Sequence, residues 1–257
     1  MTTTNTDDAV TIAAIGLLAY VSADVAHHAL GHAGACLALG GSINRLSSVV
    51  VDCTVRGSNI DLAGPLANLA LGLLALIPAH TVHNTTQRLF WILVAAFNLF
   101  WIEMQLAFSA ATRTDDWAWF LQETHAGNGV RYGLIAAGVV AYALTTRVIA
   151  RGIVPFAQPT GRARRIMTTA WLAAGGIAGL TAWLDPNAGW VFVHRAIPQS
   201  LLLSIGLLFV PNRAAARVAP SEAVAPTLTR SAPWIIAAFI VGIASVALLG
   251  PGLCTSR

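Results

Sequence analysis

The sequence predicts an all-α polytopic membrane protein with six to seven transmembrane helices and a short β-like hairpin after the first helix. Of its 257 residues, 56% are hydrophobic and only 10% are charged, whereas a soluble domain has about 25% charged residues. The apolar residues fall into blocks of about 20, long enough to cross a bilayer as a helix. A soluble helix would instead carry charged residues along its outer face. We therefore expect the protein to be embedded in the lipid bilayer, with its apolar helices in contact with lipid.

Polar breaks divide the chain into seven apolar blocks that are candidate spans. His194, Arg195 and Pro198 interrupt the sixth block, so we expect a shorter or interfacial helix there. Between the first two blocks, the β-branched stretch Gly40–Gly57 is bounded by glycines, which is typical of a small hairpin or extended segment. The candidate spans are Ala9–Leu39, Leu62–Ala79, Leu89–Ala111, Val130–Ile149, Ile166–Leu184, Trp190–Val210 and Ala232–Leu249.

The charged residues indicate contact with an anionic leaflet. The net charge is +4, and all fifteen basic residues are arginines spread between the spans. They form no single stripe with interleaved aromatic residues, so we expect no nucleic-acid partner. By the positive-inside rule, arginines after the fourth and sixth spans place those loops in the cytoplasm and the C-terminal end of the first span outside. Three cysteines are too few and too scattered for a disulfide framework or a cysteine-based zinc site.

The first span carries ionisable side chains about twenty residues from its start, in the stretch Asp24-Val-Ala-His-His-Ala-Leu-Gly-His32. Such groups are costly inside a membrane and mark candidate functional sites. His28 and His32 are four residues apart, so an α-helix places both on one face, where they can share a metal ion. Asp24, on the same face, can hold an imidazole N–H or reach the metal itself. His27 projects about 100° away from His28, and we interpret it as a packing or interfacial group.

Each of the remaining polar features also has a purely structural interpretation. The two histidines can simply hydrogen-bond neighbouring helices. Gly64-Pro-Leu-Ala-Asn68 opens the second span, and a Gly-Pro pair commonly marks a helix start. The acidic pair at Asp115 and Asp116, followed by Trp117 and Trp119, is typical of an interfacial turn. Glu103 is the sole carboxylate within the third span, where it needs a partner or a raised pKa.

Taken together and in order, these motifs resemble the site-2 protease family of intramembrane zinc metallopeptidases. The resemblance rests on His28-Ala-Leu-Gly-His32, a short β-like stretch, Gly64-Pro-Leu-Ala-Asn68 and Asp116 before Trp117, and it covers roughly residues 20–120. It implies one Zn²⁺ ion held by His28, His32 and Asp116.

The resemblance further implies that the protein hydrolyses a peptide bond in a transmembrane or membrane-adjacent protein substrate. We expect a multi-pass protein of a bacterial inner membrane. Residues 1–125 would form the metal-binding membrane core, and residues 126–257 would add transmembrane helices of unknown role.

One position departs from the family pattern. The residue after the first metal-binding histidine is a glutamate in the family, where it acts as general base on the zinc-bound water, and here it is Ala29. General acid–base help is typically worth about 10²–10⁴-fold in rate. Two explanations follow from the missing glutamate. In the first, the chain is a catalytically dead pseudopeptidase with a non-enzymatic binding or regulatory role. In the second, it takes its general base from elsewhere, with Asp24 and Glu103 as candidates. A third explanation is that Ala29 is an engineered inactivating substitution.

Overall fold

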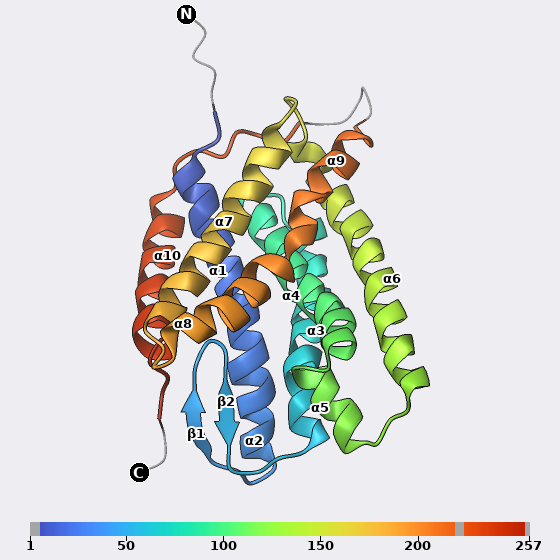
Figure 1. Ribbon diagram of the computed structural model, residues 1–257. Coiled ribbons are helices and arrows are strands. Elements are labelled where there is room, and N and C mark those ends of the chain that lie inside the picture. The colour runs from blue at the N-terminus through green and yellow to red at the C-terminus, as the bar shows by residue number, and fades with distance from the viewer. Residues whose placement is uncertain (1–5, 219–223, 255–257) are drawn as a thin grey trace, which may run out of the picture.

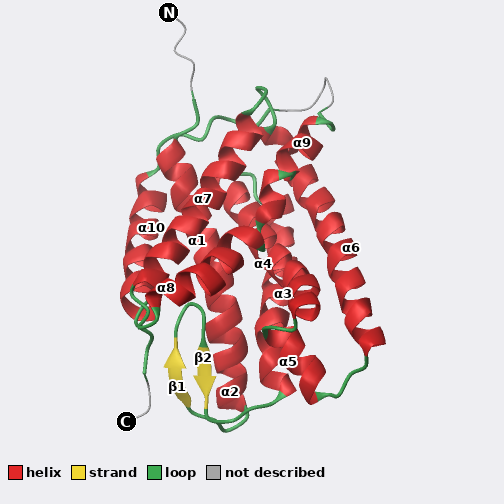
Figure 2. Cartoon of the chain, in the orientation of Figure 1, coloured by secondary structure: helices red, strands yellow, loops and turns green. Residues whose placement is uncertain are grey.

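The computed structural model describes residues 6–218 and 224–254, which form a bundle of long helices with a small hairpin at one end (Figures 1 and 2). The predicted all-α polytopic fold is confirmed. Within the described residues, six helical segments are long and apolar enough to cross a membrane: Ala9–Ala38, Ser58–Thr81, Thr85–Thr112, Asn128–Phe156, Arg162–Trp183 and Ala232–Leu249.

The first of these segments changes its helical form part of the way along. It starts as α1 (Ala9–Val25), continues as the π-helical segment η1 (Ala26–Ala33) and ends as α2 (Gly34–Ala38). Asp8 caps the start, because its carboxylate accepts a hydrogen bond from the Thr11 backbone N–H.

The other long helices are α3 (Ser58–Thr81), α4 (Thr85–Thr112), α6 (Asn128–Ile153) with the short η2 (Val154–Phe156), α7 (Arg162–Trp183), and α10 (Ala232–Ala244) with the π-helical η6 (Ser245–Leu249).

The hairpin after the first span is confirmed. Strands β1 (Ile43–Leu46) and β2 (Val51–Cys53) pair in antiparallel register. A disulfide between Cys36 and Cys53 joins this hairpin to α2. This bond was not expected from the cysteine spacing, since it depends on the hairpin folding back beside the end of the first helix.

The interrupted sixth block is a series of short helical pieces, as its polar residues predict. Pro198 has no backbone N–H and cannot continue a regular helical ladder. The pieces lie against α7, where the Trp171 indole donates a hydrogen bond to the Leu201 carbonyl. They are α8 (Ala188–Val191), η3 (Phe192–Ala196), η4 (Pro198–Leu202), η5 (Ile205–Leu208) and α9 (Val210–Ala215).

Helix α4 is the most buried of the long helices and packs against α1, α3 and α6. Its large side chains Phe97, Phe100 and Trp101 are almost wholly buried. The outer helices instead expose large apolar side chains, as lipid-facing helices do. Examples are Leu73, Leu74 and Ile77 of α3 and Phe239 and Ile240 of α10.

The two ends of the bundle are built from different elements (Figure 1). One end, which we call the hairpin end, carries β1, β2, the short helix α5 (Asp116–Glu123) and the last described residues. Leu253 pairs with Leu46 of β1 there. The opposite end, which we call the arginine end, carries the end of α6, the start of α7 and α9, and these segments contain Arg151, Arg162, Arg164, Arg165 and Arg213.

Candidate metal centre

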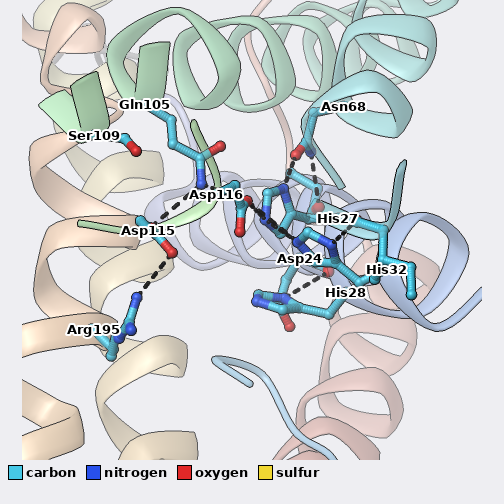
Figure 3. A network of polar contacts seen from close by, with 12 residues as sticks. Asp24, His27, His28, His32, Asn68, Gln105, Ser109, Asp115, Asp116 and Arg195 are labelled. Atoms are coloured by element: carbon cyan, nitrogen blue, oxygen red, sulfur yellow. Dashed lines mark hydrogen bonds and ion pairs between the residues drawn. The ribbon is translucent and has the colours of Figure 1, made fainter. Parts of the chain in front are cut away.

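Three buried side chains converge near the hairpin end of the bundle: His27 and His32 of η1 and Asp116 at the start of α5 (Figure 3). Asp116 Oδ2 lies 3.1 Å from His27 Nε2 and 3.3 Å from His32 Nε2. The two imidazole Nε2 atoms are 3.1 Å apart. The three atoms thus lie as close together as ligands of a single ion.

The partner of His27 fixes which ring nitrogen carries the proton. His27 Nδ1 lies 2.6 Å from Asn68 Oδ1. The Asn68 amide nitrogen donates to the Ala23 carbonyl and to Asn98 Oδ1, so the amide oxygen is the atom that faces His27. Because that oxygen can only accept, His27 Nδ1 must donate. In a neutral ring, His27 Nε2 then carries a lone pair.

His32 is held in the same tautomer. Its Nδ1 lies 2.7 Å from the backbone carbonyl oxygen of Ile60, which can only accept a hydrogen bond. His32 Nδ1 therefore donates, and Nε2 of the neutral ring has a free lone pair. A second hydrogen bond that orients each imidazole in this way is the usual outer contact of a metal-binding histidine.

The donor set fits a zinc ion. With both imidazoles neutral, two nitrogen lone pairs and a carboxylate oxygen face one another across about 3 Å, which is repulsive unless a cation or an extra proton lies between them. Two imidazoles and one carboxylate are the three protein ligands of a common type of catalytic zinc site, which keeps one position open for water. The three residues present can therefore hold the ion that the sequence led us to expect.

Electrostatics favours the ionised form of Asp116. Burial alone would raise the pKa of this carboxyl group, but the positive charge of a protonated His32 ring and hydrogen bonding with His27 and His32 outweigh burial and hold the pKa below its ordinary value. Gln105 of α4 also donates a hydrogen bond of 2.8 Å to Asp116 Oδ2. Asp116 is thus available as an anionic ligand.

The structure places the two adjacent histidines differently from the expectation. His32 and Asp116 lie together, and the third member of the cluster is His27 and not His28. The reason is the π-helical form of η1. Its hydrogen bonds run from residue i to i+5, so each turn takes more residues than in an α-helix, and residues five apart, such as His27 and His32, come to one side of the helix. The His32 ring centroid is accordingly 4.7 Å from that of His27 and 6.2 Å from that of His28.

His28 lies beside this cluster and pairs with Asp24. Its Nδ1 is 3.1 Å from Asp24 Oδ1 and 3.2 Å from the Asp24 carbonyl oxygen. Both partners accept, so His28 Nδ1 carries the proton and Nε2 is the proton-accepting atom. The His28 ring centroid is 4.8 Å from that of His27 and 6.2 Å from that of His32. Asp24 thus holds an imidazole N–H, one of the two roles expected for it.

The Gly64–Asn68 segment contributes to the cluster from α3. Asn68 is fully buried and orients His27. Gly64 leaves room for the other ring, because a Cβ atom added there would overlap the His32 imidazole. Both residues of the sequence motif therefore contact a predicted metal ligand or its neighbour.

The two other positions singled out in the sequence, Ala29 and Glu103, are not members of the three-residue cluster. Ala29 is half-buried in η1 and offers no side chain that could accept a proton. Glu103 accepts a hydrogen bond from the Thr145 hydroxyl of α6.

Sequence reasoning did not find Gln105, nor did it find Trp101, whose ring stacks on that of His27 with centroids 4.9 Å apart. The five-residue spacing of His27 and His32 was the signal in the sequence that could have identified His27.

A groove of about 620 Å³ lies between β2 and α5, next to the cluster. It includes Ile60, whose carbonyl oxygen binds His32, and the neighbouring Asp61. The groove gives an extended segment room to lie beside the hairpin. Its other lining residues are Val51, Asp52, Cys53, Val55, Arg56, Gly57, Trp119, Gln122 and Glu123.

Comparisons with protein-family models, curated proteins and solved structures gave no match for this chain. The geometry of the cluster and its membrane setting therefore carry the functional argument. They define a multi-pass membrane protein with a buried His–His–Asp cluster suited to binding a metal ion.

Proposed function

We propose that this chain is a membrane-embedded zinc protein of the site-2 protease type that hydrolyses peptide bonds in or near the membrane. The supporting observation is the convergence of His27, His32 and Asp116, with both histidines held so that Nε2 is free to bind an ion. The motif order along the sequence, from the histidines through Gly64–Asn68 to Asp116, supports the same assignment.

In this proposal the His27–His32–Asp116 cluster binds the metal ion, and the neighbouring His28 transfers protons. A zinc ion held there would supply a Lewis acid and lower the pKa of a bound water to about 7. His28 takes the role that Ala29 cannot fill: Asp24 fixes its Nδ1–H, so Nε2 accepts the proton of the attacking water. An imidazole held by a carboxylate in this way is a common general base. His28 then returns the proton to the leaving amine.

Metal analysis of the purified full-length protein tests the ligand set. We expect one zinc ion per chain, lost in His27→Ala, His32→Ala and Asp116→Ala and retained in His28→Ala. The opposite pattern for the two adjacent histidines would restore the α-helical assignment with His28 as ligand. A wild-type protein with no stoichiometric zinc, even after incubation with Zn²⁺, would overturn the zinc proposal.

Hydrolysis is tested separately, with a fluorescently labelled single-span membrane peptide in liposomes. We expect His28→Gln to bind zinc normally and to cleave the peptide about 10²–10⁴-fold more slowly than the wild type. Normal cleavage by His28→Gln would remove His28 as the base.

The absence of a glutamate at Ala29 favours a second candidate function. In that case the chain is a pseudopeptidase that binds a membrane protein without cutting it. The same peptide distinguishes the two functions: binding to the liposome-embedded protein without any cleavage supports the pseudopeptidase, whereas zinc-dependent cleavage excludes it.

A further inference from the structure

The segment that carries Asp116 adopts an unusual backbone conformation. The residue before it, Asp115, has φ = 72° and ψ = −173°. This combination of a positive φ with an extended ψ is populated almost only by glycine, and it persists in other residues only where surrounding contacts impose it. The position of Asp116 therefore depends on what holds the turn in front of it.

Contacts from α4 hold one side of this turn. Gln105 donates to Asp116 Oδ2. Ser109 donates its hydroxyl to the Thr114 carbonyl and accepts a hydrogen bond of 3.0 Å from the Ala118 backbone N–H. These contacts come from the part of the chain that the sequence assigned to the metal-binding core.

The other side of the turn is held from the second half of the chain. Arg195 Nη1 lies 2.9 Å from Asp115 Oδ1 (Figure 3). Both side chains are about one-fifth exposed, so the ion pair is partly shielded from solvent. Because Asp115 directly precedes Asp116, this pair fixes the backbone from which the third metal ligand projects.

Arg195 is itself placed by its surroundings. It lies in η3, and its guanidinium is 5.8 Å from the centre of the Trp190 ring. That ring stacks on His194 with centroids 5.1 Å apart. The interrupted helix therefore presents the guanidinium from a fixed position on the bundle.

A second ion pair joins the same region to the hairpin. Arg45 of β1 lies 2.5 Å from Asp185, in the turn between α7 and α8. The Asp185 side chain is almost fully buried. Two separate ion pairs thus connect residues 185–195 to the two segments that flank the metal centre, namely the hairpin and the turn before α5.

We propose that Arg195 is a positioning residue for the metal centre, and that residues 185–195 hold the third ligand in place by the Arg195–Asp115 ion pair. This inference depends on the proposed metal site and gives the second half of the chain a role in it. Loss of the guanidinium leaves Asp115 free to relax from its positive φ, which moves Asp116 away from His27 and His32. The defect is a loss of metal affinity.

The test measures the dissociation constant for Zn²⁺, by competition with a chelating dye, on full-length protein in nanodiscs. We expect Arg195→Gln to weaken binding about tenfold or more, as other outer contacts of metal ligands do, and Arg195→Lys to recover much of the loss. Arg164→Gln, at the opposite end of the bundle, is the matched control and should bind as the wild type does.

Asp115→Asn completes a double-mutant cycle with Arg195→Gln. If the ion pair acts as proposed, the double variant binds Zn²⁺ no worse than either single variant. The thermal stability of the metal-free proteins separates positioning from general support of the fold. Wild-type zinc affinity in Arg195→Gln, with or without a lower metal-free melting temperature, would overturn the inference while leaving the metal site intact. A wild-type protein that binds no zinc would overturn the site itself.

Discussion

Asn68 and His27 are joined by a buried hydrogen bond of 2.6 Å, in which the imidazole Nδ1 donates to the amide oxygen. They lie 41 residues apart in the sequence, on α3 and η1. The bond is directional, because the Asn68 amide nitrogen is engaged by Ala23 and Asn98. Asn68 thereby selects the tautomer of His27 that can bind a metal ion.

Replacement of Asn68 by alanine should reduce zinc affinity about 10–100-fold, since outer contacts of metal-binding histidines typically contribute that much. The affinity is measured by competition titration. Asn44→Ala, which removes a half-buried asparagine of the hairpin that bonds Asp52, is the control. Equal affinities in the two variants would contradict the role given to Asn68.

Replacement of Gly64 by alanine should displace the His32 ring, because the new methyl group overlaps the imidazole. Overpacking of this kind typically costs about 1–3 kcal/mol, and here it also moves a ligand. We expect lower zinc occupancy and a lower melting temperature. Gly129→Ala, where an added Cβ meets open space, should behave as the wild type in both measurements. Full occupancy in Gly64→Ala would argue against His32 as a ligand.

Introduction of the family residue by Ala29→Glu separates the two candidate functions. If the chain is a pseudopeptidase that lacks only its base, the variant gains cleavage of the labelled peptide that the starting protein lacks. If His28 already acts as the base, the starting protein cleaves the peptide and the added carboxylate gives less than a tenfold change. Rates are compared at equal zinc content. A gain of cleavage from zero would rule out His28 as a working base.

The hairpin end should face the oxidising side of the membrane. Disulfides such as Cys36–Cys53 form in oxidising compartments, and the arginines at the opposite end indicate the cytoplasm. Cys254 is free and exposed, next to the Leu253–Leu46 pair at the hairpin end. An impermeant maleimide should therefore label Cys254 in intact cells.

The control for this labelling is Arg164→Cys in a Cys254→Ser background, which should react only after the membrane is permeabilised. The reverse pattern of labelling would place the hairpin end in the cytoplasm. It would also be inconsistent with the disulfide.

Much of the fold follows from local sequence properties. Long apolar blocks predicted the spans, and His194, Arg195 and Pro198 predicted the interruption of the sixth block. The hairpin followed from the β-branched stretch between glycines. These features depend on residues close together in the chain, so the sequence alone was sufficient.

The details of the site depend on contacts that local patterns do not encode. His32 and Asp116 could be selected because the order of the motifs resembles that of a known family. His27 could not be selected under the assumption of α-helical spacing, because its position beside His32 and Asp116 arises from the π-helical form of η1. The Cys36–Cys53 bond and the Arg195–Asp115 pair depend on how distant segments pack.

The helical form of η1 places His27, and not His28, beside His32 and Asp116. A change of one residue in the register of this single turn would exchange the positions of the two imidazoles without any change in composition. A motif search that assumes four-residue spacing therefore finds the right segment of this chain but selects the histidine that lies outside the three-residue cluster. For membrane metalloproteins with adjacent histidines, ligand assignment should begin from backbone hydrogen bonding and not from the letters of the motif.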